Sequence, residues 1–209
     1  MNFITTVVLA VGVYLWSFAA QATLIVNGSF ETNVVAKNNW NYFSAAQVAG
    51  WEGSNIEIWH GLNGVTAGEG KQHVELNADG NNKGAWSIYQ NFATEMGKTY
   101  DFSFMYRARA NNNEAFLFSI ADIKTTVDNH TVGQWLKFSG SFTANSLLSS
   151  IRFTSLNNGT MGNFLDDVHV TAAPVQPQSL KVAEASTLSV LALGLVLLAL
   201  RRRSTTKAA

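Results

Sequence analysis

The side chains best suited to binding a ligand are tryptophans that alternate with carboxylates. In the segment 55–59, Glu57 and Trp59 share the polar face of an extended chain, and Glu75 lies on the polar face of a second alternating segment, residues 72–77. An indole ring can stack on the apolar face of a sugar, and carboxylates accept hydrogen bonds from its hydroxyl groups. If the two segments pair in a sheet, these three side chains lie together on one surface.

Three further aromatic residues are candidates for ligand contact. Trp135 lies on the polar side of its own alternating segment. Trp40 and Tyr42 belong to an aromatic stretch, residues 40–43, which we expect to be a loop that lines the edge of a groove. The alternative is that these rings fill the hydrophobic core, as most aromatic side chains do, or that a loop covers a tryptophan at the surface.

The same residues offer only weak support for catalysis. Glu57 and Glu75 resemble the carboxylate pair of a glycosidase, in which one group acts as an acid and the other as a base or nucleophile. The sequence contains no G-x-S-x-G nucleophile elbow and no H-E-x-x-H zinc motif, and its four histidines lack the spacing of metal ligands. We therefore expect no enzymatic activity, with a glycan-processing enzyme as a distant alternative.

Alternating hydrophobic residues predict that short β-strands position these side chains. The clearest segment is 99–107, in which Tyr100, Phe102, Phe104 and Tyr106 fall on one face. The other strand candidates are residues 55–59, 72–77, 86–92, 115–121, 134–142 and 163–170, with a further alternating pair at Ile151 and Phe153. Turns rich in Asn and Gly separate these segments, and none of the segments has a helical period. We expect an all-β fold, an antiparallel β-sandwich of the jelly-roll type.

The composition excludes several classes of partner. The 14 basic residues balance the 14 acidic residues, so the formal net charge is zero, and charged residues make up only 13% of the chain. Nucleic-acid binding needs clustered Lys and Arg, so we expect no nucleic-acid partner. The sequence contains no cysteine, which excludes disulfides and thiolate metal sites. The hydrophobic core, with or without the help of a metal ion, must therefore stabilise the domain.

The first 22 residues have the features of a signal peptide. Val7–Trp16 forms an apolar core, and the small residues Ala20 and Ala22 suit cleavage by signal peptidase after Ala22, where polar sequence follows. The first residues contain no Lys or Arg, so an uncleaved N-terminal anchor is the alternative. We expect export, with the sandwich domain at residues 23–172.

The C-terminal part has three sections, which are a linker at residues 173–184, an apolar segment with a basic end at residues 185–203, and a short tail at residues 204–209. The linker contains both prolines of the chain. The apolar segment would be about 24 Å long as a helix, which is short for a bilayer core of about 30 Å. Its basic end is typical of a cytoplasmic stop signal. We expect an intermediate anchored in the inner membrane with a cytoplasmic tail; a core helix or a disordered tail is the alternative.

The order of these sections resembles the PEP-CTERM sorting signal, in which a Pro-Glu-Pro motif precedes a hydrophobic helix and terminal arginines. Glu184 and Ser186 lie in the motif region, and Arg201, Arg202 and Arg203 form the basic end. The resemblance implies sorting to the surface by an exosortase-like protease in a Gram-negative-type bacterium that makes exopolysaccharide. Alanine occupies both positions where the family has proline, so a related tail or simple membrane retention stays an alternative.

The sequence after the leader resembles galactose-binding-like jelly rolls, and in particular the extracellular DUF642-like and choice-of-anchor group. The resemblance is based on the opening motif Asn27-Gly28-Ser29-Phe30-Glu31 and on later motifs that include residues 50–51, 70–77, 97–100 and 165–168. It covers most of residues 23–171 and implies a fold like that of carbohydrate-binding modules.

The same resemblance implies a structural calcium ion. Its ligands would be Glu31, Asp166 and backbone oxygens such as that of Gly28, because calcium prefers six to eight hard oxygen donors. Asp167 is an alternative to Asp166, since adjacent strand residues face opposite sides. If no calcium binds, Glu31 is an exposed loop residue and the two aspartates form a turn.

Together these observations predict an exported, non-catalytic β-sandwich that binds or associates with extracellular polysaccharide, at the cell surface or in the matrix of a biofilm. The main alternative is a structural surface or matrix protein that contacts other proteins and has no specific glycan site.

Overall fold

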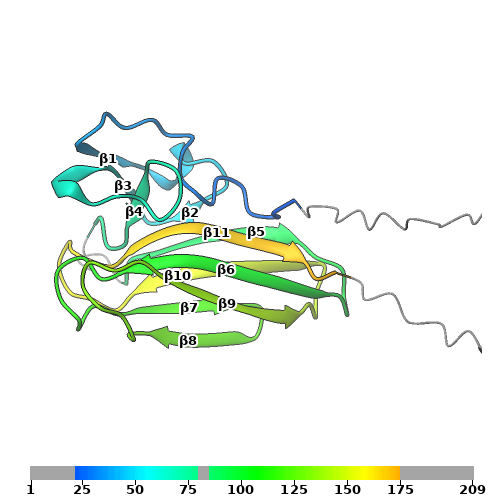
Figure 1. Cartoon of the computed structure of the whole chain (residues 1–209). Helices are drawn as coiled ribbons and strands as arrows, with labels where there is room; N and C mark the ends of the chain where they lie inside the picture. Colours follow the sequence, from blue (N-terminus) through cyan, green and yellow to red (C-terminus); the bar gives the residue numbers. More distant parts are fainter. Residues whose placement is uncertain (1–21, 80–84, 175–209) are drawn as a thin grey trace, which may run out of the picture. The chain divides into compact units, whose positions relative to one another are not determined.

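The structure, a computed structural model, describes residues 22–79 and 85–174 (Figure 1). Within these ranges, no helix is long and apolar enough to cross a membrane. The predictions for the leader before Ala22, for most of the linker and for the sorting tail fall on residues outside these ranges. They include the predictions for Ala20, Glu184, Ser186, Arg201, Arg202 and Arg203.

The described residues form two antiparallel sheets. The six-stranded sheet has the order β1-β3-β4-β11-β6-β9, and the five-stranded sheet has the order β2-β5-β10-β7-β8. The first sheet contains β1 (Asn39–Phe43), β3 (Ile56–His60), β4 (His73–Glu75), β11 (Phe164–Ala172), β6 (Thr99–Arg107) and β9 (Leu136–Thr143). The second contains β2 (Glu52–Gly53), β5 (Ser87–Ala93), β10 (Leu148–Ser155), β7 (Phe116–Ile120) and β8 (Ile123–Val127). Two 3-10 helices, η1 (Ala45–Gln47) and η2 (Leu62–Gly64), lie in the connections. The predicted all-β antiparallel sandwich is confirmed.

Aromatic side chains from both sheets fill the space between the layers. All four aromatic residues on the predicted inner face of β6 are buried. The ring of Phe104 lies 4.8 Å from the ring of Phe118 on β7 and 5.0 Å from the ring of Phe153 on β10, measured between centroids. Because these contacts join strands of different sheets, the alternation seen in the sequence positions the two layers against each other.

Three strands were not predicted, and all of them are short or lie at an edge. Residues 40–43, expected to be a loop, belong to β1, which pairs with β3 at one edge of its sheet. Its sequence, Asn-Trp-Asn-Tyr-Phe, is exposed at its first four positions, so it lacks the buried face that the search for alternation depends on. The strands β2 and β8 are the two edges of the other sheet.

The N-terminal segment lies against both sheets and is held by buried amides. The side chain of Gln90 on β5 accepts a hydrogen bond from the Val26 N–H at 2.7 Å and donates one to the Val26 carbonyl at 3.0 Å. Two residues further on, the Gly28 carbonyl accepts the Val168 N–H of β11 at 3.0 Å. β11 has a register shift between Asp166 and His169, where the segment approaches it.

The closeness of this approach predicts that Gly28→Ala destabilises the domain. A Cβ atom at position 28 would lie 2.0 Å from the Val168 carbonyl oxygen, a backbone atom that cannot move without distorting β11. We expect a loss of about 2–3 kcal/mol in the free energy of unfolding, measured by urea denaturation.

Gly64→Ala is the matched control. Gly64 has a φ of +73°, but nothing lies within 4 Å of its Cβ position, so only backbone strain of about 1 kcal/mol applies. An equal loss of stability in the two variants would contradict the close approach at Gly28.

Candidate functional site

The candidate ligand-binding residues of three strands share the outer face of the six-stranded sheet. In the register of β1, β3 and β4, Trp40 lies opposite Trp59 and Tyr42 lies opposite Glu57, while Glu57 lies opposite Glu75 on its other side. The segments 55–59 and 72–77 therefore pair, which was the condition for bringing these side chains together. The five side chains nevertheless differ in exposure.

The two aromatic residues of β1 are open to solvent. Trp40 is 45% exposed and Tyr42 is 43% exposed. The Tyr42 hydroxyl donates a hydrogen bond to the Asp79 carboxylate, and it accepts one from the Asn55 amide at 2.5 Å. Asn55 also donates to Asp79 at 3.0 Å, so the three side chains form a closed network. The hydrogen bond to Asp79 raises the pKa of Tyr42, which therefore stays a neutral donor.

Asparagine side chains occupy the free edge of β1. Asn39 Oδ1 accepts the N–H of Trp40, and Asn41 Oδ1 accepts the N–H of Tyr42, both at 2.9 Å. An edge strand with unpaired N–H groups can pair with another chain, and these bonds satisfy two of the groups locally. They also hold the backbone that carries the two exposed rings. We name Trp40 and Tyr42, with Asn55, Asp79 and the half-buried Glu57, the aromatic edge.

Trp59 and Glu75 are buried, which differs from the exposed surface that we expected. Trp59 is 3% exposed, and its indole N–H donates to Glu57 at 2.6 Å. The Arg109 guanidinium lies over the Trp59 ring at 4.8 Å and forms an ion pair with Glu75. Arg109 is an important residue that the sequence analysis missed. It follows the end of β6 in a loop, and no pattern marks it.

His73 lies at the centre of this covered surface. Its ring contacts Phe164 at 4.7 Å and Trp135 at 5.5 Å, and neither ring nitrogen has a hydrogen-bond partner among the described residues. Burial, with the nearby charge of Arg107, lowers the pKa of His73 to about 3, so the ring is neutral and packs as an apolar group. Trp135 is half-buried, and its indole N–H donates to the Thr66 carbonyl at 2.9 Å. Trp135 therefore covers His73, and a loop holds it in place.

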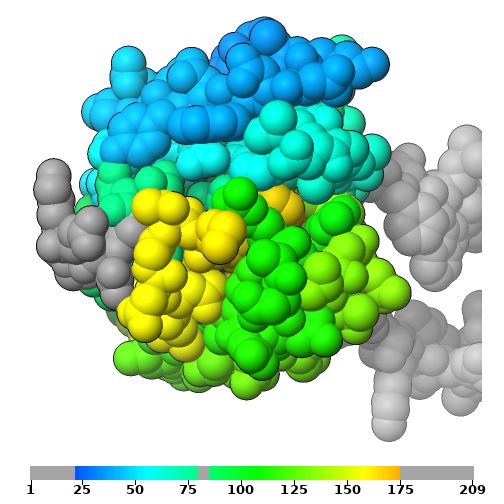
Figure 2. Space-filling view, turned by 90° about the vertical axis from the view of Figure 1, so that its left-hand side faces the viewer, coloured from blue at the N-terminus to red at the C-terminus, as the bar shows by residue number. Residues whose placement is uncertain are grey.

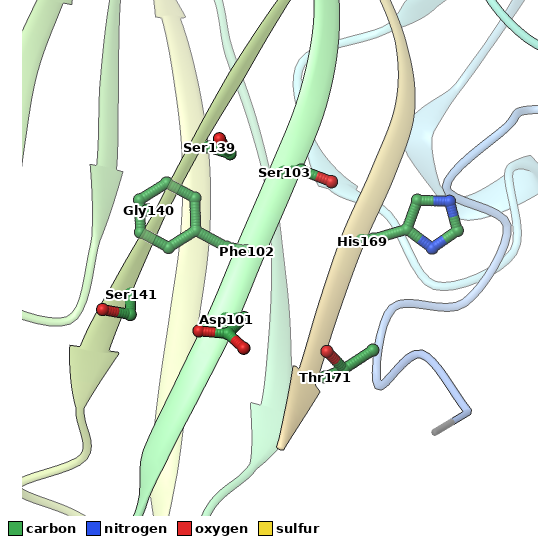
Figure 3. Close-up of a pocket in the computed structure, with 8 residues that line it drawn as sticks. All are labelled: Asp101, Phe102, Ser103, Ser139, Gly140, Ser141, His169 and Thr171. Atoms are coloured by element: carbon green, nitrogen blue, oxygen red, sulfur yellow. The ribbon is translucent and has the colours of Figure 1, made fainter. Parts of the chain in front are cut away.

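A second feature of the outer face is a shallow hollow that we name the serine trough (Figure 3). Two cross-strand rows of small polar residues form it on β11, β6 and β9, with a volume of about 440 Å³. The rows are Thr171, Asp101 and Ser141, and His169, Ser103 and Ser139. Phe102 and Gly140 complete the lining. No pattern in the sequence predicted this hollow.

Two of the three predicted calcium ligands, Glu31 and Asp166, contact one loop, residues 68–72. Glu31 Oε1 accepts the N–H groups of Lys71 and Gln72 at 2.6 and 2.8 Å. Asp166 Oδ2 accepts the N–H groups of Gly68 and Glu69, each at 2.9 Å. The two carboxylates therefore converge on the same loop, but both accept hydrogen bonds from its amide groups.

The donor set at this loop fits calcium only in part. Burial raises the pKa of Asp166 to about 8, and a nearby cation would favour its ionised form. A hollow of about 380 Å³ beside Gly28 is lined by two more carboxylates, Glu69 and Asp167, with His169 close by. Among the described residues, however, no group of three His, Cys, Asp or Glu side chains has the arrangement of a metal site. Backbone oxygens would have to supply most of the ligands.

Comparisons with known proteins give a distant sequence relative and several structures of similar fold. No family model matches the chain. Halomucin of Haloquadratum walsbyi (strain DSM 16790 / HBSQ001) is 30% identical over 175 residues, which cover 75% of this chain but only 2% of halomucin. The chain thus spans a very small part of that relative.

The solved structures of similar fold include carbohydrate-binding modules. TmCBM61, solved in complex with β-1,4-galactotriose, is 14% identical, with a TM-score of 0.44 over 73% of this chain and 99% of the module. A family 35 carbohydrate-binding module from Clostridium thermocellum is 17% identical, with a TM-score of 0.43 over 65% of this chain and 99% of the module. The CBM22-2 xylan-binding domain of Paenibacillus barcinonensis Xyn10C is 13% identical, with a TM-score of 0.43 over 64% of this chain and 99% of that domain.

The geometry of Glu57 and Glu75 does not suit a glycosidase. The two residues are directly opposite on β3 and β4, and the Glu75 carboxylate is fully buried and ion-paired with Arg109. Glycosidase pairs need about 5 Å or more between the carboxyl groups, with the substrate bond between them. Burial raises the pKa of both groups, while Trp59 and Arg109 lower that of Glu57. With Arg109 as the nearby cation for both, the arrangement is that of a buried polar network.

The raised pKa of Glu75 predicts a pH-dependent stability. Burial moves this pKa from 4.5 to about 7, against the opposing effects of Arg109 and the Gly162 N–H. Between these values the folded protein binds more protons than the unfolded chain, so the free energy of unfolding falls as the pH rises through this window. Glu75→Gln keeps the shape of the protonated group and removes this titration. We expect the wild type to lose about 1–3 kcal/mol relative to the variant from pH 4.5 to 7.

The measurement is urea denaturation of both proteins at several pH values. Titrating groups that both proteins share, such as His73, contribute equally to the two free energies of unfolding and cancel in their difference. Parallel stability curves would show that the Glu75 carboxyl does not titrate in this range.

Proposed function

We propose that this chain is a non-catalytic protein that binds extracellular polysaccharide through the aromatic edge of its six-stranded sheet. The observation that carries the proposal is the exposure of two aromatic rings, Trp40 and Tyr42, side by side on one face of an edge strand. Residues two apart on a strand place their side chains about 7 Å apart on the same side. The pair therefore forms an apolar strip along which the rings of a glycan chain can stack.

Polar groups beside the strip supply hydrogen bonds for sugar hydroxyls. The Asp79 carboxylate and the Asn55 amide lie at the Tyr42 hydroxyl, and the half-buried Glu57 faces Tyr42 from the neighbouring strand. The network that joins Tyr42, Asn55 and Asp79 holds the ring before a ligand arrives. Such preorganisation lowers the entropy lost on binding. A planar aromatic surface with fixed acceptors around it matches a sugar better than it matches a lipid or a nucleic acid.

The same proposal includes export and sorting to the cell surface or extracellular matrix. It is supported by the leader that ends at Ala22 and by the apolar segment 185–203 with its terminal arginines. Signal peptidase and an exosortase-like protease are the proposed processing partners, with an intermediate anchored in the inner membrane. The alternative, a structural surface protein without a glycan site, would not need the ordered aromatic edge.

A glycan site at the aromatic edge predicts that Trp40→Ala and Tyr42→Ala weaken polysaccharide binding. Loss of one stacking ring lowers affinity about tenfold, which corresponds to about 1.4 kcal/mol. The measurement is affinity electrophoresis of the full chain in gels that contain a panel of neutral and acidic bacterial and plant polysaccharides. Retardation by at least one polysaccharide, reduced in both variants, is the expected result.

Two controls locate the effect. Tyr89→Ala removes an aromatic ring from β5 of the other sheet, where Arg152 stacks on it at 4.0 Å, and should leave retardation unchanged. Ser139→Phe fills the serine trough from β9 and should also leave it unchanged. If only Ser139→Phe abolishes retardation, the trough holds the glycan. No retardation of the wild type by any polysaccharide would favour the structural alternative.

We also propose a structural calcium ion beside the loop 68–72, bound by Glu31, Asp166 and the Gly28 carbonyl. The convergence of both carboxylates on this loop and the burial of Asp166 support the proposal. A bound ion would join the first and last parts of the sandwich and stabilise it without disulfides.

Calcium binding predicts that the melting temperature rises by about 5–10 °C when calcium replaces a chelator. Asp166→Asn should lose this difference. A melting temperature that is the same in calcium and in chelator would contradict the proposed ion.

A further inference from the structure

Three large aliphatic side chains are exposed together at one end of the sandwich. Met96 is 69% exposed in the turn between β5 and β6, and Leu147 and Leu148 are 71% and 61% exposed at the turn between β9 and β10. The two turns lie side by side, because the Gly97 N–H donates to the Ala144 carbonyl at 2.7 Å and the Thr94 N–H donates to the Leu147 carbonyl at 3.0 Å. We name Met96, Leu147 and Leu148 the apolar tip.

The described chain begins and ends at this same end of the sandwich (Figure 1). The Ala173 N–H donates to the Thr99 carbonyl at 2.9 Å, and Thr99 is the first residue of β6 after the turn that carries Met96. At the other terminus, the Leu24 N–H donates to the Val170 carbonyl at 2.7 Å. Whatever follows Ala173 therefore leaves the domain beside the apolar tip.

We propose that the apolar tip inserts into the interface of a lipid bilayer and holds the sandwich on the membrane surface. Clustered exposed aliphatic side chains on a soluble domain indicate an interaction surface. Unlike the aromatic edge, the tip consists of flexible aliphatic side chains, which suit acyl chains rather than sugar rings. Apolar groups at the tips of turns can enter the boundary between headgroups and acyl chains while the backbone of the turns stays in water.

The charges at the tip favour the same partner. Lys98 and Glu95, in the turn that carries Met96, form an ion pair at 2.9 Å and neutralise each other. The tip therefore presents apolar surface without a net charge from this turn. Its attachment should depend on apolar contact and only weakly on salt or on anionic lipid.

The length and composition of the chain after Ala173 argue for lipid as the occupant. The linker 174–184 follows Ala173 directly and can span at most about 40 Å when fully extended before the apolar segment 185–200 begins. That segment has no charged residue, and Ser189 and Gly194 are the only interruptions of the apolar run from Leu188 to Leu200, a composition typical of a membrane segment. A tip that is held this close to a bilayer meets it at a high effective concentration.

The test uses the full chain, which has no natural cysteine, so one introduced cysteine takes one probe. Asn145→Cys, at an exposed position and labelled with an environment-sensitive NBD fluorophore, reports from the turn beside Leu147 and leaves the tip intact. The chain is mixed with vesicles of phosphatidylethanolamine and phosphatidylglycerol that contain a nitroxide-labelled lipid. We expect a blue shift of the NBD emission and at least twofold quenching by the nitroxide.

Met161→Cys is the matched control at the opposite end of the sandwich. It lies in the loop between β10 and β11, which neighbours the loop after β6 in Figure 2, and Met161 is itself 51% exposed. Met161 is exposed and apolar, as the residues of the apolar tip are, but it lies at the other end of the sandwich. Its probe should show neither shift nor quenching.

A second variant separates apolar contact from simple tethering. Met96→Ser combined with Leu147→Ser and Leu148→Ser keeps the linker and the apolar segment and should abolish the quenching at position 145. Its circular dichroism should be unchanged, because all three side chains are exposed. Retardation by polysaccharide should also be unchanged, so this result is independent of the aromatic edge.

Three outcomes would overturn the proposal. They are equal signals from the probes at positions 145 and 161, unchanged quenching in the triple variant, and a full chain that does not float with the vesicles.

Discussion

Aromatic rings from two sheets meet between the layers, and their contacts constrain everything else in the domain. Phe104 on β6 lies about 5 Å from Phe118 and Phe153, which belong to the opposite sheet. A slip of one residue in the pairing of β6 would turn its four inner rings to solvent and bring Asp101 and Ser103 inside. The register of β6 with β11 and β9 is therefore strongly specified. That register also places the small polar residues of the serine trough in rows on the outer face.

The outer face of the six-stranded sheet divides into a covered part and open parts. Over β3 and β4, Trp59, His73 and Glu75 are as buried as the core, because Arg109 and Trp135 lie across them. Burying Glu75 requires a counter-charge, which Arg109 supplies, and burying His73 requires a neutral ring. This covered layer leaves the aromatic edge on one side and the serine trough on the other. The packed layer therefore separates these two open surfaces.

The sequence predicted the fold far better than the state of its site. Alternation at residues 99–107 reproduced β6 residue for residue, because an interior strand with one buried face leaves a clear pattern. Alternation also placed Glu57 and Glu75 on the polar faces of their strands, but it left the pairing of the two strands open. What alternation does not show is which side chains from distant loops cover an outer face. Arg109 reaches Trp59 from a loop far along the chain, so Trp59 was expected at the surface. The edge strand β1 was expected to be a loop, because an exposed strand has no apolar face.

The two groups of exposed apolar residues differ in a way that bears on their roles. At the aromatic edge, the hydroxyl of Tyr42 and the backbone N–H groups of Trp40 and Tyr42 have hydrogen-bond partners, so the Tyr42 ring and the backbone that carries both rings are held in place. A ligand with its own directional hydroxyl groups gains from such order, because little entropy remains to be lost. At the apolar tip, Met96 and its neighbours have flexible aliphatic side chains that carry no hydrogen-bonding group. A fluid bilayer does not require fixed side-chain positions, so the flexibility of these side chains weakens their binding to it only slightly. The order of one surface and the flexibility of the other therefore match a glycan and a lipid, respectively.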